Sequence, residues 1–152
     1  MIYFLIIIVG IGLDRLTKIY AVKNFIDHPI EGKLINLTYL ENRGAAFGIL
    51  QDKRILFVIL TISIVFYLLY YFLKNIKTNP SILNIALAMI ISGAIGNFYD
   101  RLFQGYVVDF IEFSFVNFPV FNVADIFVTV GCGLMIIYIM IYGEKSNDRK
   151  YR

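Results

Sequence analysis

The chain has 152 residues, of which 59% are hydrophobic and only 16% charged, and its formal net charge is +3. A soluble protein of this size could not bury so much apolar surface, so the composition indicates a single membrane domain over residues 1–152. The basic residues do not form a stripe among aromatic side chains, which argues against nucleic acid as a partner. A lone cysteine, Cys132, and a lone histidine, His28, exclude an intrachain disulfide and argue against a metal site.

Four stretches are apolar enough and long enough to cross a bilayer, which takes about 20 residues. Because backbone groups cannot stay unpaired in lipid, each stretch is predicted to be a helix. The predicted helices are residues 1–22, 55–73, 82–99 and 126–143. The first lacks both a basic leader and a small-x-small cleavage site, so we interpret it as a retained helix rather than a cleaved signal peptide.

Two longer segments, 23–54 and 100–121, are predicted to lie outside the membrane. Residues 34–40 alternate in polarity and include β-branched and aromatic side chains, and residues 106–115 are similar. This pattern is typical of short strands. The predicted fold is therefore an all-α membrane protein, with four transmembrane helices and a small strand-like extramembrane subdomain.

An even number of spans places both chain ends on the same side of the membrane. Each side then carries six basic residues, so their number alone does not decide the orientation. The tail 144–152 holds the only dense basic cluster, and basic residues favour the cytoplasmic side. We therefore expect the termini to be cytoplasmic.

Charged residues interrupt the first predicted helix. Asp14 and Lys18 are four residues apart, so they lie on one face and can pair. This pair could be architectural or could belong to a functional site, and both interpretations stay open. Arg15 is expected to point elsewhere, with its long stem reaching the lipid headgroups.

Two aspartates stand out beside the later helices. Asp109 ends the run Val-Val-Asp, and Asp125 directly precedes the last apolar stretch. An ionised acid at bilayer depth costs about 2.5–3.5 kcal/mol, so such residues are usually functional. Two acids brought together can share one proton and supply a base and an acid at once. Hydrolysis of a peptide bond by aspartates requires that combination.

Further polar residues fall near the predicted helix ends. Asn122 shares a helix face with Asp125, where simple helix capping is the alternative explanation. Asn97 and Arg101 share a face at the end of the third helix, and Arg101 should find a carboxylate, a carbonyl or a lipid phosphate. Helix ends on one membrane face would gather these groups into a polar cluster, which predicts a site.

The segment Asn42–Gly48 is rich in small residues, and an ordinary turn is the alternative there. Asn42 could hold a substrate backbone, because its amide offers both a donor and an acceptor. Gly93 and Gly96 lie on one face of the third helix and should let another helix approach closely.

Five blocks occur in the order found in bacterial lipoprotein signal peptidases (signal peptidase II), and with them the chain resembles that family over essentially its whole length. The blocks are Asp14–Lys18, Asn42–Gly48, Gly93–Arg101, Val107–Phe110 and Phe121–Asp125. The chain departs from the usual pattern at Ser92, where glycine is common, and at Thr17, where serine is common. Both replacements are small, and we expect neither to remove activity.

The resemblance implies a multi-pass aspartyl endopeptidase of the bacterial inner or plasma membrane. Such an enzyme removes the signal peptide from diacylglyceryl-modified prolipoproteins, cutting before the lipidated cysteine, with its site near the outer face. Asp109 and Asp125 match the catalytic pair. The residues that match substrate-binding or site-shaping positions are Asp14, Lys18, Asn42, Gly44, Asn97, Arg101 and Asn122. The resemblance also implies no metal or other cofactor, inhibition by globomycin and, in our expectation, action as a monomer.

Two other classes of protein also use intramembrane polar or small residues. A small transporter or proton channel should carry charges at mid-span on several helices, whereas the second to fourth spans carry none between their ends. A structural assembly subunit would explain Gly93 and Gly96 but not Asp109 in a loop. Both fit the residues less well than the peptidase does.

Overall fold

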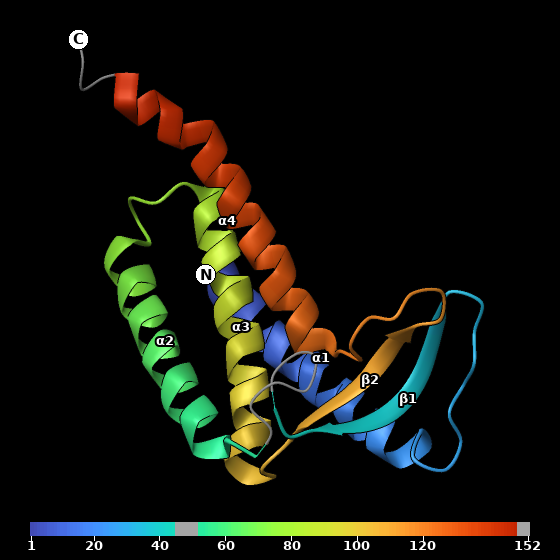
Figure 1. Ribbon diagram of the computed structural model, residues 1–152. Coiled ribbons are helices and arrows are strands. Elements are labelled where there is room, and N and C mark those ends of the chain that lie inside the picture. The colour runs from blue at the N-terminus through green and yellow to red at the C-terminus, as the bar shows by residue number, and fades with distance from the viewer. Residues whose placement is uncertain (45–51, 149–152) are drawn as a thin grey trace.

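The computed structural model describes residues 1–44 and 52–148, with side chains considered up to Ile141. Ala45–Gly48, which belong to the block Asn42–Gly48, and residues 149–152 of the basic tail lie outside that description. The elements in chain order are α1 (Ile2–Asn24), β1 (Ile35–Asn42), α2 (Arg54–Asn75), α3 (Ser81–Phe103), β2 (Val107–Phe113) and α4 (Val123–Asp148). Figure 1 shows four helices in a bundle, with the two strands extending from one end of it.

Among the described residues, three helices have the length and apolar composition of a membrane span, namely α2, α3 and α4 over Val123–Ile141. The remaining helix, α1, has 23 residues. That number corresponds to about 34 Å at 1.5 Å per residue. It differs from the other three in carrying Asp14, Arg15 and Lys18 close together. The predicted membrane fold with four helices is thus confirmed, and within the described helices the charged residues lie in α1 and near the ends of the other three.

The centre of the bundle is α3, which packs against all three other helices. Ala86, Ala88 and Ile91 on α3 are completely buried. Small residues let the helices approach: a methyl group at Gly93 would overlap the carbonyl oxygen of Ala124, and one at Gly96 would overlap the carboxylate of Asp14. Small residues at helix contacts are the usual means of close packing in membranes. The expectation for this glycine face is therefore confirmed.

The outer helix α2 exposes most of its apolar side chains, and Phe72 is its one buried residue in the described structure. Ile55 and Phe66, for example, are 75% and 68% exposed. Surfaces of this kind are not stable in water but need no covering in lipid, whose tails are as apolar as leucine. The exposure pattern is that of a membrane-embedded bundle.

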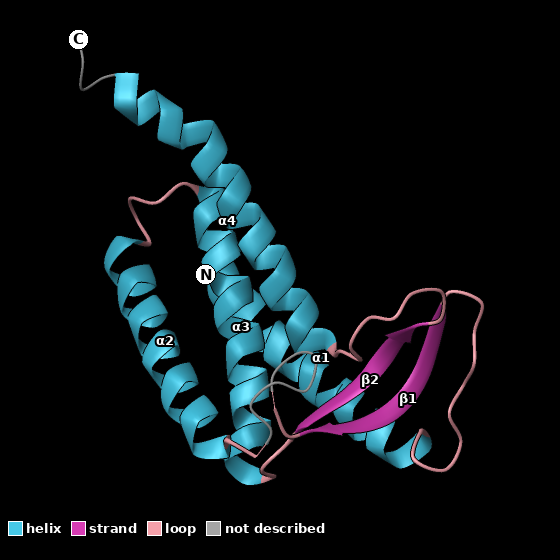
Figure 2. Ribbon diagram, in the orientation of Figure 1, coloured by secondary structure: helices cyan, strands magenta, loops and turns pink. Residues whose placement is uncertain are grey.

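The two strands form an antiparallel sheet, in which Leu40 pairs with Asp109 and Asn42 with Val107. The register shifts between Leu37 and Leu40. Figure 2 shows the sheet beside the C-terminal part of α1. The contact includes a small core of Ala21, Phe25, Val108 and Phe110. This sheet is the strand-like subdomain that the sequence predicted.

All four helices differ from the predicted bounds, by one to five residues at each end, and two of these differences concern polar residues of the cavity region. The third helix continues past residue 99 to Phe103, because Arg54 donates hydrogen bonds to the carbonyls of Arg101 and Leu102 and so satisfies its C-terminal end. The fourth helix begins at Val123 rather than 126, which places Asp125 in its first turn.

Candidate active site

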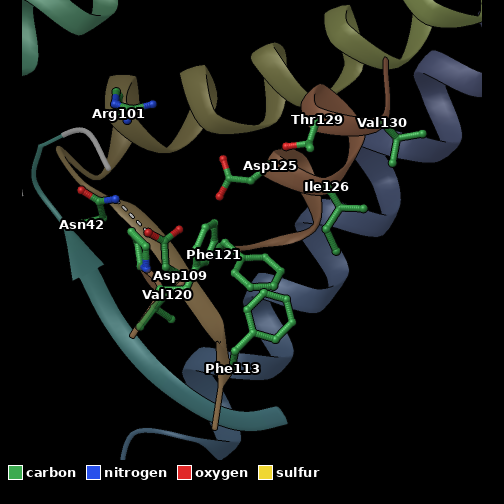
Figure 3. A pocket seen from close by; sticks show the side chains of 12 residues that line it. Asn42, Arg101, Asp109, Phe113, Val120, Phe121, Asp125, Ile126, Thr129 and Val130 are labelled. Atoms are coloured by element: carbon green, nitrogen blue, oxygen red, sulfur yellow. Dashed lines mark hydrogen bonds between the residues drawn. The ribbon is translucent and has the colours of Figure 1, made fainter. Parts of the chain in front are cut away.

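A cavity of about 430 Å³ opens where the sheet meets the bundle. Its lining residues are Asn42, Arg101, Asp109, Phe113, Phe118, Pro119, Val120, Phe121, Asp125, Ile126, Thr129 and Val130. Figure 3 shows the carboxyl groups of Asp109 and Asp125 facing the same part of the cavity, with aromatic and aliphatic side chains beyond them. Mostly apolar walls with a few convergent polar groups are typical of binding sites for small molecules and peptides.

Asp109 reaches this cavity from β2 and is almost completely buried, with 1% of its surface exposed. Asn42 on the paired strand donates to its Oδ2 at 2.8 Å, and Asn122 donates to its Oδ1 at 2.6 Å. Burial, and after it the nearby charge of Asp125, raises the pKa of Asp109 from 3.8 to about 7, although both amides lower it. A carboxyl group with such a pKa can keep its proton at neutral pH.

Asp125 comes from the first turn of α4 and is only partly buried. Asn97 on α3 donates to its Oδ1 at 2.7 Å. Its Oδ2 accepts from the backbone N–H of Asn122 at 3.1 Å, while Asn122 Oδ1 accepts from the N–H of Asp125 at 3.0 Å. This reciprocal pair is a capping box. The capping explanation for Asp125 is therefore confirmed, and it does not compete with a site, because the same carboxylate lines the cavity.

Asn122 joins the two acids. Its side chain is completely buried, and its Nδ2 lies within hydrogen-bond distance of Asp109 Oδ1, Asn97 Oδ1 and the carbonyl of Val108. Its backbone N–H and its Oδ1 at the same time serve Asp125. One amide thus fixes the strand that carries Asp109 against the helix that carries Asp125.

Arg101 lies at the edge of the cavity that is farther from Phe113 (Figure 3). Its NH2 donates to the carbonyl of Gly44 at 3.2 Å, and its guanidinium lies 4.9 Å from the ring centre of Phe57. Arg101 was expected to find a carboxylate, a carbonyl or a lipid phosphate, and among the described residues it finds a backbone carbonyl. Gly44 in turn donates its N–H to Asn42 Oδ1 at 3.0 Å, which turns the Asn42 amide nitrogen toward Asp109.

Asp14 and Lys18 lie behind the cavity rather than in its wall. They form the predicted ion pair, at 2.9 Å, and both are buried. Asp14 also accepts from the N–H of Ala124 at 2.9 Å, and Lys18 donates to Asn97 Oδ1 at 2.9 Å. The pair is architectural in that it joins α1 to α3 and α4. It also contacts the site, because Asn97, which accepts from Lys18, donates to Asp125.

The prediction for Arg15 was wrong. Instead of pointing away, its NH1 lies 2.8 Å from Asp100 Oδ1, and its guanidinium stacks 5.0 Å from the ring centre of Tyr99. The long stem lets the guanidinium reach across to α3, although Arg15 is next to Asp14 in sequence. Asp100, which the sequence did not single out, is completely buried and also pairs with Lys18 at 2.9 Å.

The apolar wall of the cavity was also not predicted. Phe113, Phe118 and Phe121 form a cluster with ring centres 5.2 to 6.0 Å apart. Thr129 follows Asp125 by four residues, one helical turn, and shares its face. The helical spacing from Asp125 could have predicted Thr129 as a site residue. The aromatic cluster could not be predicted in this way, because it depends on the antiparallel bridge between Ile111 and Phe121.

Comparisons with known proteins agree over nearly the whole chain. The family model described as signal peptidase (SPase) II matches residues 6–141. The lipoprotein signal peptidase of Clostridium tetani is 45% identical over 152 residues, covering 96% of each chain. That of Clostridium novyi is 46% identical over 146 residues, covering 92% of this chain and 98% of the relative.

Solved structures give the same result for the fold. One bacterial membrane enzyme superposes with a TM-score of 0.86 at 36% identity, covering 94% of this chain and 90% of the other. A second bacterial membrane enzyme gives a TM-score of 0.80 at 38% identity. The chain therefore belongs to the lipoprotein signal peptidase family, the aspartic peptidases known as signal peptidase II, and is a multi-pass bacterial membrane enzyme.

Proposed function

We propose that this protein removes signal peptides from diacylglyceryl-modified prolipoproteins, cutting before the lipidated cysteine, and that Asp109 and Asp125 are its catalytic pair. The observation that supports the pair is their common position: both line one cavity, and Asn122 bonds to both. Family membership supports the substrate class, since the relatives are lipoprotein signal peptidases.

In the proposed mechanism the two carboxyl groups share one proton. We place that proton on Asp109, because burial and the charge of Asp125 raise its pKa to about 7. Asp125 is the base. Its carboxylate accepts hydrogen bonds from the side chain of Asn97 and from the backbone N–H of Asn122, and it lies at the N-terminus of α4, where negative charge is favoured.

The chemical step follows from this assignment. Asp125 takes a proton from a water molecule as the water oxygen attacks the scissile carbonyl carbon. Asp109 donates its proton to the carbonyl oxygen, giving a tetrahedral diol. When the diol collapses, the C–N bond breaks, the leaving amine takes the proton from Asp125, and a diol hydroxyl returns a proton to Asp109. General acid and base catalysis of this kind typically contributes 10²–10⁴-fold.

The walls of the cavity fit a largely apolar peptide with a lipid attached. Phe113, Phe118 and Ile126 line it beyond the acids, and the exposed apolar surface of α4 adjoins it. Acyl chains lying on that surface would exchange one apolar neighbour for another. Arg101 and Asn42 also line the cavity, and in this proposal they hold the carbonyl groups of the peptide.

We further propose that the termini face the cytoplasm and the sheet faces the outer side of the membrane. Figure 1 shows the α2–α3 turn and the C-terminal part of α4 at one end of the bundle, with the sheet at the other. Tyr3, near the N-terminus, donates to Ser81 beside that turn. Lys74 and Lys77 lie by that turn and suit a cytoplasmic position. We expect the enzyme to act as a monomer and to be inhibited by globomycin.

The function is tested with purified protein in detergent and one precursor in two forms, with and without the diacylglyceryl group on its cysteine. We expect cleavage directly before the cysteine of the lipidated form, abolished by globomycin, and little cleavage of the unmodified form. Equal cleavage of both forms, or cleavage at another bond, would contradict the proposed specificity.

A further inference from the structure

We propose that Asp100 is a positioning residue for the two-aspartate site, acting through Lys18 and Asn97 on Asp125. This inference rests on the proposed function. Asp100 contacts neither the cavity nor the two acids of the site. The inference is supported by a continuous set of short contacts, from Asp100 on α3 to Lys18 on α1, back to Asn97 on α3, and from there to Asp125 on α4.

The first step is the burial of three charged side chains that contact one another. Asp14, Lys18 and Asp100 each have no more than 2% of their surface exposed. Lys18 lies 2.9 Å from an oxygen of each acid. Removing one partner of a buried ionic group leaves the other charge without compensation, which costs several kcal/mol. The position of the Lys18 ammonium is therefore determined by both carboxylates, not by Asp14 alone.

The second step leads from Lys18 to Asn97. The third donor of the ammonium goes to Asn97 Oδ1 at 2.9 Å. Since an ammonium group has donors only, this contact requires the oxygen of the Asn97 amide to face Lys18. The amide nitrogen must then face the other way, and it donates to Asp125 Oδ1 at 2.7 Å. Lys18, together with the Asn122 amide, whose Nδ2 lies 3.1 Å from the same oxygen, thus selects the amide orientation in which Asn97 can hold Asp125.

The third step is the hold on Asp100 itself. Arg15 donates to its Oδ1 at 2.8 Å, and so does Gln104 at 2.8 Å. Its Oδ2 faces Lys18 and also accepts a longer, 3.4 Å bond from the N–H of Val108. With donors on both oxygens, the carboxylate cannot rotate without losing a partner. Asp100 is a fixed anchor for Lys18, with a weaker second contact to the strand that carries Asp109.

Replacing Asp100 with asparagine tests this chain of contacts. The amide has nearly the same shape but lacks the charge, so Lys18 should shift toward Asp14 and release Asn97. We expect kcat to fall by about 10- to 100-fold, the scale on which small misplacements of catalytic groups act. KM should change by less than about twofold, because no cavity wall is altered. Glu112→Gln is the matched control, since Glu112 accepts a hydrogen bond from Asn36 on the same sheet, away from the cavity.

A double-mutant cycle separates positioning from general destabilisation. If Asp100 acts through Lys18, adding Asp100→Asn to Lys18→Met should lower kcat by less than about threefold more, the remainder reflecting the Val108 contact. Fully additive losses in kcat would overturn the proposal. So would a folded Asp100→Asn enzyme with the kcat of the wild type.

A readout that does not depend on cleavage keeps this inference separate from the proposed function. The side-chain amide ¹⁵N–¹H signals of Asn97, assigned by their loss in Asn97→Ser, should shift in Asp100→Asn and not in Glu112→Gln. Arg15→Gln, which loosens the same carboxylate from its exposed side, should give a smaller shift of the same sign. Unchanged Asn97 signals in the folded variants would refute the positioning role, whereas a wild-type protein that cuts no lipidated precursor would refute only the proposed function.

Discussion

The amide of Asn122 offers a sharp test of how the two acids are tuned. Its Nδ2 donates to Asp109 Oδ1 at 2.6 Å, and neither residue has more than 1% of its surface exposed. A hydrogen bond to a charged group is worth about 1.5–3 kcal/mol. At 1.36 kcal/mol per pKa unit, losing it should change the pKa of Asp109 by about 1–2 units.

The direction of this change follows from which form the bond favours. The Asn122 N–H stabilises the ionised carboxylate and so lowers the pKa of Asp109, which burial and Asp125 raise to about 7. Asn122→Ala should therefore raise that pKa further. The other groups that act on the pKa of Asp109, namely Asn42, Asp125 and Lys18, are not themselves replaced in this variant.

The assay is the pH dependence of kcat between pH 5 and 9. Because the mechanism needs a proton on Asp109, the wild-type rate should decline above about pH 7. The declining limb should move to higher pH by about 1–2 units in Asn122→Ala, with a lower maximum because Asp109 is less firmly held. Asn36→Ala, which removes an amide from Glu112 on the same sheet, should leave the limb unchanged. A limb that stays fixed or moves to lower pH would refute the reasoning.

Three further predictions concern stability and binding. Asp109 has a folded-state pKa near 7 against 3.8 unperturbed, so its burial lowers stability increasingly as the pH rises from about 4 to 7. Asp109→Asn should therefore raise the melting temperature more at pH 8 than at pH 5; an equal gain at both would contradict this. Gly93→Ala should lower the melting temperature, since overpacking against the Ala124 carbonyl costs about 1–3 kcal/mol, while Gly133→Ala, with open space around it, should not. Calorimetry showing equal effects would argue against the close helix contact. Thr129→Phe should raise KM for the lipidated precursor several-fold at an unchanged melting temperature, and an unchanged KM would remove Thr129 from the substrate site.

Much of the framework could be predicted from the sequence, because it depends on local patterns. Apolar stretches of span length predict the helices, and alternation predicts residues near 34–40 as a strand. The place of Asp125 at the start of a predicted helix made capping one explanation for it, and the structure contains a capping box with Asn122. Gly93 and Gly96 predict a close helix contact, because small residues leave room for a neighbouring backbone.

Contacts between distant segments could not be predicted in the same way. Arg15 and Asp100 are 85 residues apart, and the direction of a long arginine stem is not determined by its place in a helix. No local pattern marks Asp100, because only the packing of α1 on α3 brings Lys18 to it. The convergence of Asp109 with the start of α4 likewise depends on strand pairing and on the bridge between Ile111 and Phe121.

The central claim is that Asp109 and Asp125 together activate water. The most direct test is single-turnover cleavage of a diacylglyceryl-modified precursor by purified Asp109→Asn and Asp125→Asn, with Glu112→Gln as the folded control. We predict that each asparagine variant loses about 10²–10⁴-fold in rate while remaining folded, and that the control cleaves like the wild type. A folded variant of either aspartate that cleaves at the wild-type rate would contradict the account.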